Sequence, residues 1–209
     1  MKKVLLSVAA LMIAGITFGQ TKFGIVAGPN FSSATVKGAN DSKETGDLLV
    51  GVRAGFTADL QLADEFYIGT GLLYAGKGTK HKDNNNFKTT LSYLQVPVNF
   101  LFKPEVGSGK LNLGVGPYLA YGVAGKHKGT LDLPGGNINS ELKAFDDEAE
   151  LWQLKRFDAG LGVVIGYEMA QGLYFGLNAD LGLINAYNNT DNDRSWRNTS
   201  FGVSLGYKF

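Results

Sequence analysis

The sequence predicts an all-β protein, an eight-stranded antiparallel up-and-down transmembrane β-barrel. Large apolar residues alternate with glycine and polar residues through eight segments, and a period of two is that of a β-strand. Long and short connections alternate between those segments. The first residues have the layout of an export signal. Together, these observations indicate a barrel that leaves the cytoplasm.

Composition excludes several classes of protein. The 209 residues suit one domain, and a net charge of +1 without a basic run argues against nucleic acid as a partner. The absence of cysteine excludes disulfides, thiolate zinc sites and cysteine catalysis. The 29 glycines are spread among aromatic and branched residues, and 44% of all residues are hydrophobic, so disorder fits poorly. We expect no metal and no cofactor.

Residues 1–19 have the composition of a secretory signal peptide. Lys2 and Lys3 form the positive start, a largely apolar run covers residues 4–16, and cleavage is expected between Gly19 and Gln20. An N-terminal membrane anchor is the alternative, although the run is short of the ~20 residues that a spanning helix needs. We therefore expect residues 20–209 to form the barrel domain.

Four strands are expected in the first part of the mature chain, at residues 22–31, 50–62, 66–75 and 91–102. The second is the clearest, with apolar residues from Val50 to Leu62 alternating with glycine and polar residues. The first is short and contains Pro29. Pro97 interrupts the fourth, and because proline cannot donate a ladder hydrogen bond, we expect a bulge or a gap there.

Four further strands are expected at residues 111–123, 157–169, 173–184 and 200–209. The last three alternate almost without error. Pro117 lies in the first of them, and a bulge or gap is expected there too. Tyr118 and Tyr174 fall on the glycine-rich face, where the lack of neighbouring side chains leaves room for them.

The connections fix an orientation. Three connections are short, at residues 63–65, 103–109 and 170–172. Four others are long and polar, at residues 32–49, 76–90, 124–153 and 188–197. Outer-membrane barrels have short periplasmic turns and longer extracellular loops. We therefore expect both termini in the periplasm.

The polarity of the two faces separates a membrane barrel from a soluble one such as a lipocalin. A soluble barrel places its large apolar residues inside and its charges outside. Here one face is almost wholly large and apolar, while the other is glycine with a few charged and amide residues. The second face suits the narrow inside of a small barrel, so the first is expected to contact lipid. Aromatic residues near the strand ends, Tyr187 among them, fit either interfacial girdles or simple strand propensity.

The inward polar residues are expected to form a structural network that fills the lumen. The set is Arg53, Asp59, Gln95, Asn99, Asp158, Glu168, Asn178, Asp180 and Lys208, with Thr57 and Asn112 beside them. Arg53 and Asp180 lie at similar heights, and since an unpaired buried charge is costly, we expect them to pair. Asp59, Glu168 and Lys208 lie nearer the periplasmic end. Passage of ions or protons through the network is the alternative.

Residues 140–152 carry Leu142, Phe145, Ala149 and Trp152 at near-helical spacing, so a loop helix over the barrel mouth, or a docking surface, is expected there. The acidic residues of this stretch lack calcium-ligand spacing.

A catalytic site in the outer loops would need a nucleophile and a base. His81 and His127 fall in predicted loops, near Ser92, Ser140, Asp83 and Glu141. Their spacing matches no motif, and loop histidines are usually solvated. No catalytic residue is therefore expected, and the protein is predicted not to be an enzyme.

Four segments resemble the outer-membrane β-barrel ("porin family") proteins common in Bacteroidetes, which are similar in shape to small barrels of the OmpA/OmpX type. They are Gly24 to Ser32, Tyr93 to Pro97, Gly114 to Tyr118, and Leu205 to Phe209. The resemblance covers the whole mature chain. It implies a place in the outer membrane of a Gram-negative bacterium among its lipids, recognition of Phe209 by the barrel-assembly machinery, and no shared catalytic residues.

The function expected from these features is structural, or an interaction at the cell surface through long loops, with a side-chain-filled lumen and a monomeric barrel. A narrow channel for small solutes or ions is the first alternative, although the interior of an eight-stranded barrel is filled by side chains. A lipid-modifying enzyme is the second.

Overall fold

The computed structural model describes residues 21–37, 43–80, 87–133, 136–146, 153–188 and 194–209. The predicted signal peptide, with its cleavage site at Gly19 and Gln20, lies outside the described residues. Within the described residues the chain has no helix long and apolar enough to cross a membrane. Every regular element there is a strand.

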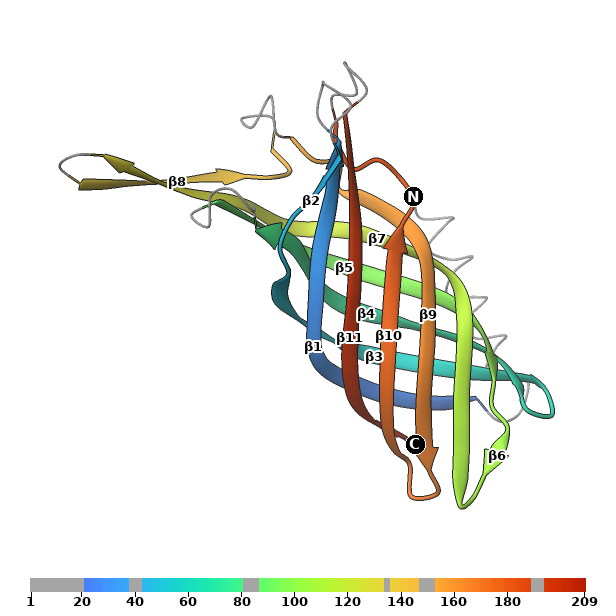
Figure 1. Ribbon diagram of the computed structural model, residues 1–209. Helices are drawn as coiled ribbons and strands as arrows, with labels where there is room; N and C mark the ends of the chain where they lie inside the picture. Colours follow the sequence, from blue (N-terminus) through green and yellow to red (C-terminus); the bar gives the residue numbers. More distant parts are fainter. Residues whose placement is uncertain (1–20, 38–42, 81–86, 134–135, 147–152, 189–193) are drawn as a thin grey trace, which may run out of the picture.

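Eight strands form one closed antiparallel barrel, as predicted (Figure 1). They are β1 (Lys22–Lys37), β3 (Leu49–Ala63), β4 (Phe66–Lys80), β5 (Phe87–Phe102), β7 (Gly109–Leu133), β9 (Phe157–Met169), β10 (Leu173–Gly182) and β11 (Ser195–Lys208). Neighbours in the chain are neighbours in the sheet, and β11 pairs with β1 to close it. Closure leaves no barrel strand without a partner on either side, which is the condition for spanning hydrocarbon.

The two ends of the barrel differ. At the terminal end, where β1 begins and β11 ends, the connections are short, and one of them contains the two-residue strand β6 (Glu105–Val106), which pairs with β7. At the opposite, loop end, β2 (Lys43–Thr45) extends the sheet beside β1, and β8 (Gly136–Lys143) pairs with the end of β7. The predicted alternation of short and long connections is therefore present.

Several strands run further at the loop end than the alternation predicted. The longest, β7, has 25 residues and forms with β8 a two-stranded ribbon that projects beyond the barrel wall (Figure 1). Residues 140–143 belong to β8, so the predicted helix over residues 140–152 is wrong there. The near-helical spacing of the apolar residues does not form a helix there, because these residues pair with β7 instead, with Leu142 opposite His127. Residues 147–152 lie outside the described part of the chain.

The prolines leave gaps in the hydrogen-bonded ladder without shifting its register. Pairing of β4 with β5 is interrupted between Thr70↔Val98 and Leu73↔Gln95, across Pro97. Pairing of β5 with β7 is interrupted in the same way across Pro117. On its other side, Pro117 pairs with β9 without interruption. Of the two expected irregularities, it is the gap that occurs at both prolines.

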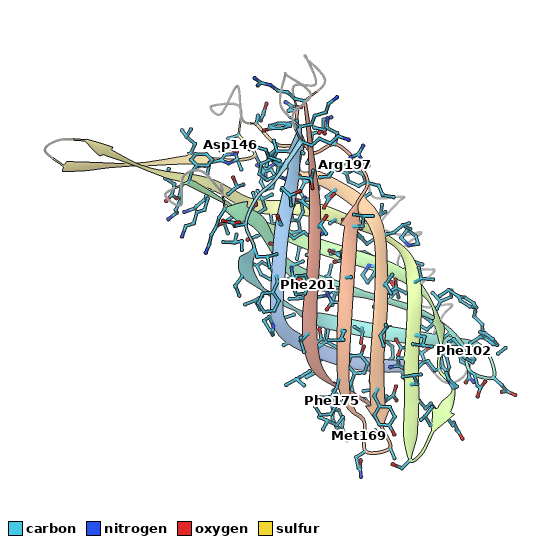
Figure 2. The ribbon with its side chains drawn as sticks, in the orientation of Figure 1. Phe102, Asp146, Met169, Phe175, Arg197 and Phe201 are labelled. Carbon is cyan, nitrogen blue, oxygen red and sulfur yellow. The ribbon has the colours of Figure 1, made fainter. Side chains whose placement is uncertain are left out.

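The inner and outer faces of the wall have the predicted polarity. Along β10, Phe175 and Leu177 are exposed on the outside, while Tyr174 and Asn178 are buried inside. Gly166 and Gly176 make room for the Tyr174 ring, since a Cβ at either would lie 2.3–2.5 Å from its hydroxyl oxygen. Figure 2 shows the side chains along the wall, with Phe175 near the terminal end.

Candidate functional site in the barrel lumen

An ion cluster fills the lumen near the terminal end. Lys103 Nζ lies 3.0 Å from Asp59 Oδ2 and 2.7 Å from Glu168 Oε2. Lys208 Nζ lies 2.9 Å from Asp59 Oδ2, and the partly exposed Lys22 reaches the other oxygen of Glu168 at 2.7 Å. The four buried members thus balance as two lysines and two carboxylates, which offsets much of the cost of removing them from water.

A second ion cluster lies deeper, toward the loop end. Arg53 Nη1 lies 2.7 Å from Asp180 Oδ2, and Gln95 Nε2 donates to the same oxygen at 3.0 Å. The structure therefore brings Arg53 and Asp180 together as their heights in the sequence pattern suggested. Each is at least 94% buried at its side chain, so the pair is desolvated as a unit.

Asp158 gathers the remaining polar groups of the deeper cluster. Its Oδ2 lies 3.4 Å from Lys77 Nζ and accepts hydrogen bonds from Tyr118 Oη at 3.4 Å and Asn198 Nδ2 at 3.2 Å. The Lys77 ammonium also lies 4.2 Å from the centre of the Tyr118 ring, in cation–π range. This cluster also balances, with two cations and two carboxylates.

A cavity of about 70 Å³ separates the two clusters. Arg53 and Lys208 border it, and so do three asparagines, Asn99, Asn112 and Asn178. One side-chain atom of each asparagine has no hydrogen-bond partner among the described residues. At about 10–15 Å³ per water, the cavity has room for about five to seven waters, and the asparagines would offer them hydrogen-bond partners.

The loop end of the lumen is closed by an apolar cap. Its large members come from five different elements or connections: Tyr93, Tyr118, Phe145, Leu154, Tyr187 and Trp196. The Phe145 and Tyr93 rings meet edge to face at 6.0 Å, as do those of Tyr187 and Trp196. Burial raises the pKa of the Tyr187 phenol. Tyr187 therefore belongs to the cap, so of the two interpretations of the strand-end aromatic residues, the interfacial girdle does not apply to it.

The nine predicted lumen residues fall into three groups. Asp59, Glu168 and Lys208 are in the terminal cluster, Arg53, Gln95, Asp158 and Asp180 are in the deeper one, and Asn99 and Asn178 line the cavity. All nine are buried.

Two buried lysines were missed by the sequence analysis. Lys77 and Lys103 lay just past the predicted strand ends, in segments interpreted as connections. The alternation could have found both, because inward residues occur at every second position. Lys77 lies two residues beyond the inward Ala75, and Lys103 lies two residues beyond the inward Leu101. Without them, the buried acids of each cluster would outnumber its buried cations.

The residues considered for catalysis do not gather. His127 is buried on the inner face of the β5–β7 wall, where its Nδ1 lies 2.8 Å from Thr89 Oγ1, so its expected solvated position is wrong. Ser92 lies on the outer face, bonded to Tyr74, and Glu141 bonds to lysines on the exposed face of the ribbon. His81 and Asp83 lie outside the described residues, and nothing is described of the Ser140 side chain.

Metal binding has no site in the part of the chain that the structure describes, since no three histidine, cysteine or carboxylate residues come together there. The lumen acids are instead neutralised by lysine and arginine.

Comparison with known proteins identifies the family. A family model described as outer membrane protein beta-barrel domain matches residues 14–188. The chain belongs to this family. It is thus an outer-membrane barrel, and its outward apolar face contacts lipid. No curated protein matches the sequence.

Several solved outer-membrane proteins have a similar fold. The attachment invasion locus protein Ail of Yersinia pestis has 10% identity and a TM-score of 0.48, over 91% of this chain and 99% of its own. Neisserial surface protein A has 13% identity and a TM-score of 0.44, over 90% and 97%. OprG of Pseudomonas aeruginosa has 15% identity and a TM-score of 0.43, over 90% and 95%.

Proposed function

We propose that this protein is a closed outer-membrane barrel that acts at the cell surface through its loop-end elements, and that it is neither an open pore nor an enzyme. Residues 1–19 would be removed as a signal peptide on export, and both termini would face the periplasm. The barrel would act as a monomer, with lipid covering the apolar outward residues of the barrel strands.

The closure of the lumen supports this proposal most strongly. A solute entering from the loop end meets the cap, where Tyr93 and Tyr118 are almost fully buried. Below it lie the Arg53–Asp180 pair and then the Lys103 cluster, each holding its partners at hydrogen-bond distance. Passage would require all three layers to open, and each separated charge would be left in a low-dielectric interior.

The size of the loop-end elements supports a role at the surface. A membrane-spanning strand needs about 9–11 residues, whereas β7 has 25. The surplus forms the ribbon with β8, and the Phe145 that follows β8 is folded back into the cap. A large part of the chain therefore lies beyond the membrane-spanning strands, at the end of the barrel opposite the termini.

Conductance in planar bilayers tests the closed lumen. We expect the refolded full-length protein to give no steady openings under conditions in which a general porin, used as the positive control, conducts. Steady openings that disappear in the variant Arg53→Met would instead establish a channel through the deeper cluster.

The narrow channel remains the second candidate, because the 70 Å³ cavity already holds room for water between the two clusters. A Phe145→Ala variant separates the two functions. A surface barrel stays silent when the cap is thinned, since the charge clusters still close it, whereas a capped channel gains openings.

Surface labelling of intact cells tests the orientation. An epitope inserted between β7 and β8 should be recognised by antibody on intact cells, whereas one inserted after Gly107, in the turn at the terminal end, should be recognised only after lysis. The reverse result would invert the proposed orientation.

The C-terminal residue is proposed as the contact of the barrel-assembly machinery. The Phe209 side chain is 70% exposed, while its backbone N–H donates to Phe23 O at 2.7 Å. Phe209→Ala should therefore lower the amount of assembled barrel in cells without weakening the barrel after refolding in vitro. Equal assembly of both proteins in cells would refute this contact.

A further inference from the structure

A row of lysines crosses the outer face of the barrel wall at the loop end. Lys80 of β4 lies directly opposite Lys88 of β5, and Lys88 lies directly opposite Lys128 of β7. Directly opposed residues of antiparallel strands share a face, and like charges in such positions repel. The row has a carboxylate at each end, Glu141 opposite Lys128 and Asp47 opposite Lys80, so the three lysines still exceed its acids by one.

A second row lies two residues closer to the membrane on the same face. In it, Lys126 of β7 is directly opposite Lys143 of β8. The lysines at 126, 128 and 143 expose about half or more of their side chains. The two rows form a single basic surface, which we call the lysine wall: Lys80, Lys88, Lys126, Lys128 and Lys143.

The acidic residues of the same wall leave it positively charged. Glu141 bonds Lys126 and Lys128, at 2.5 and 2.8 Å, which lowers the pKa of its carboxyl to about 2. Asp146 pairs with Lys143 at 3.1 Å, and Asp47 lies opposite Lys80 through a backbone bridge, so the five lysines exceed these three carboxylates by two. Within the described residues, Lys80 and Lys88 have no carboxylate partner.

The height of the lysine wall above the lipid-facing band follows from the register. Tyr74, Leu94 and Tyr121 form the row at the upper edge of that band. Lys80 and Lys88 lie six residues further along their strands, which is about 20 Å along the strand and about 14 Å along the barrel axis at a tilt near 45°. In Figure 1 the ribbon continues the line of β7 away from the barrel.

We propose that the lysine wall binds the phosphate groups of a phosphorylated glycolipid headgroup, that of lipopolysaccharide, in the leaflet at the loop end. The wall is continuous with the lipid-facing surface, so a lipid beside β4, β5 and β7 places its headgroup against it. The lysines project where an anion would relieve their mutual repulsion. Because the leaflet is assigned by the orientation proposed above, this inference rests on the proposed function.

The height favours a sugar headgroup over a glycerophospholipid. The headgroup layer of an ordinary bilayer is about 5–8 Å thick on each side, and the Lys80–Lys88–Lys128 row lies at about twice that height. The phosphate of a glycerophospholipid stays close to the acyl chains, whereas phosphorylated sugars extend further from them. Lys126, in the lower row, lies between the two levels.

Binding of purified lipopolysaccharide to the refolded full-length protein tests the proposal. The triple variant K80Q/K88Q/K128Q should bind at least tenfold more weakly, because each lysine beside an anionic surface contributes severalfold to affinity. The control K43Q/K110Q/K155Q removes the same charge elsewhere and should bind as the wild type does. Equal binding by the wild type and K80Q/K88Q/K128Q would overturn the proposal.

Further binding experiments vary the lipid and the anion separately. Lipopolysaccharide stripped of phosphate should bind the wild type as weakly as native lipopolysaccharide binds the triple variant. Vesicles of phosphatidylglycerol should not distinguish wild type from triple variant, and if they do so as strongly as lipopolysaccharide, the glycolipid assignment is wrong. Displacement of lipopolysaccharide by millimolar inorganic phosphate would show a site for free phosphate and would also overturn it.

The test does not depend on the orientation in cells. If the ribbon epitope were inaccessible on intact cells while the purified protein still discriminated lipopolysaccharide through the lysine wall, the proposed orientation would fail and the binding site would stand. The converse result would remove the binding site alone.

Discussion

Removing the charge of Arg53 is the perturbation from which the structure predicts the clearest loss of stability. Arg53→Met keeps a long side chain but leaves Asp180 buried without its cation, held only by Gln95 Nε2 at 3.0 Å. Loss of one partner of a buried pair costs about 3–5 kcal/mol. Because the Gln95 hydrogen bond remains, we expect a value near the lower end, about 3 kcal/mol.

The assay is unfolding by urea from phospholipid vesicles, followed by tryptophan fluorescence, for which Trp196 in the cap is a probe. The double variant Arg53→Met/Asp180→Asn should recover about 2 kcal/mol of the loss, since neither charge then remains. A single variant that loses less than about 1 kcal/mol, or a double variant whose loss equals the sum of the single losses, would refute the account of a coupled pair.

Two further predictions concern the closing seam and the ribbon. Gly28→Ala should prevent stable pairing of β1 with β11, because its Cβ would lie 1.9 Å from the carbonyl oxygen of Val203; a gel on which the refolded variant keeps the heat-modifiable migration of the wild type would contradict this. The Glu141 carboxyl should titrate near pH 2, because its hydrogen bonds to Lys126 and Lys128 lower its pKa. Since the folded pKa lies below the usual 4.5, the contact contributes fully above pH 4.5 and is lost as the pH falls through about 2; a carboxyl-carbon NMR titration with its midpoint near 4.5 would show that the contact does not persist in solution.

The membrane-spanning part of the barrel could be predicted because its two faces obey one simple rule. Strand β9 has the predicted bounds, Phe157–Met169, and the seven other barrel strands contain most or all of their predicted segments. A period of two with large apolar residues outside can be recognised in each strand without knowing which strands pair with it. The lumen residues followed from the same parity, since the inward set of each strand is fixed once its outward set is known.

The loop end could not be predicted in this way, because outside lipid both faces of a strand can be polar. In β7 the outward residues have odd numbers as far as Val123 and even numbers beyond it, so Lys126 and Lys128 face outward although the earlier alternation would place them inside. The alternation in the sequence therefore ended at Val123, whereas the strand β7 continues to Leu133. For the same reason β8 was missed, and the spacing of Leu142 and Phe145 indicated a helix that pairing with β7 excludes.

The cap depends on contacts that no local pattern carries. Phe145, in the connection after β8, and Trp196, near the start of β11, are far apart in the chain and belong to one cluster because the barrel closes. Their position over Tyr93 and Tyr118 follows from the path of the chain after β8 and at the start of β11. Sequence parity placed Tyr118 inside the barrel, but it did not indicate what lies above it.

The central claim, a barrel with its apolar set in lipid and its glycine and polar set in a filled lumen, is tested most directly by a cysteine scan along β10. The chain has no native cysteine, so each of the ten positions from Leu173 to Gly182 can carry one spin label in the protein reconstituted in bilayers. We predict collision with oxygen, which concentrates in lipid, to be high at the odd-numbered positions and low at the even-numbered ones throughout the strand. The opposite phase, with even-numbered positions in lipid, or no alternation at all, would contradict the account.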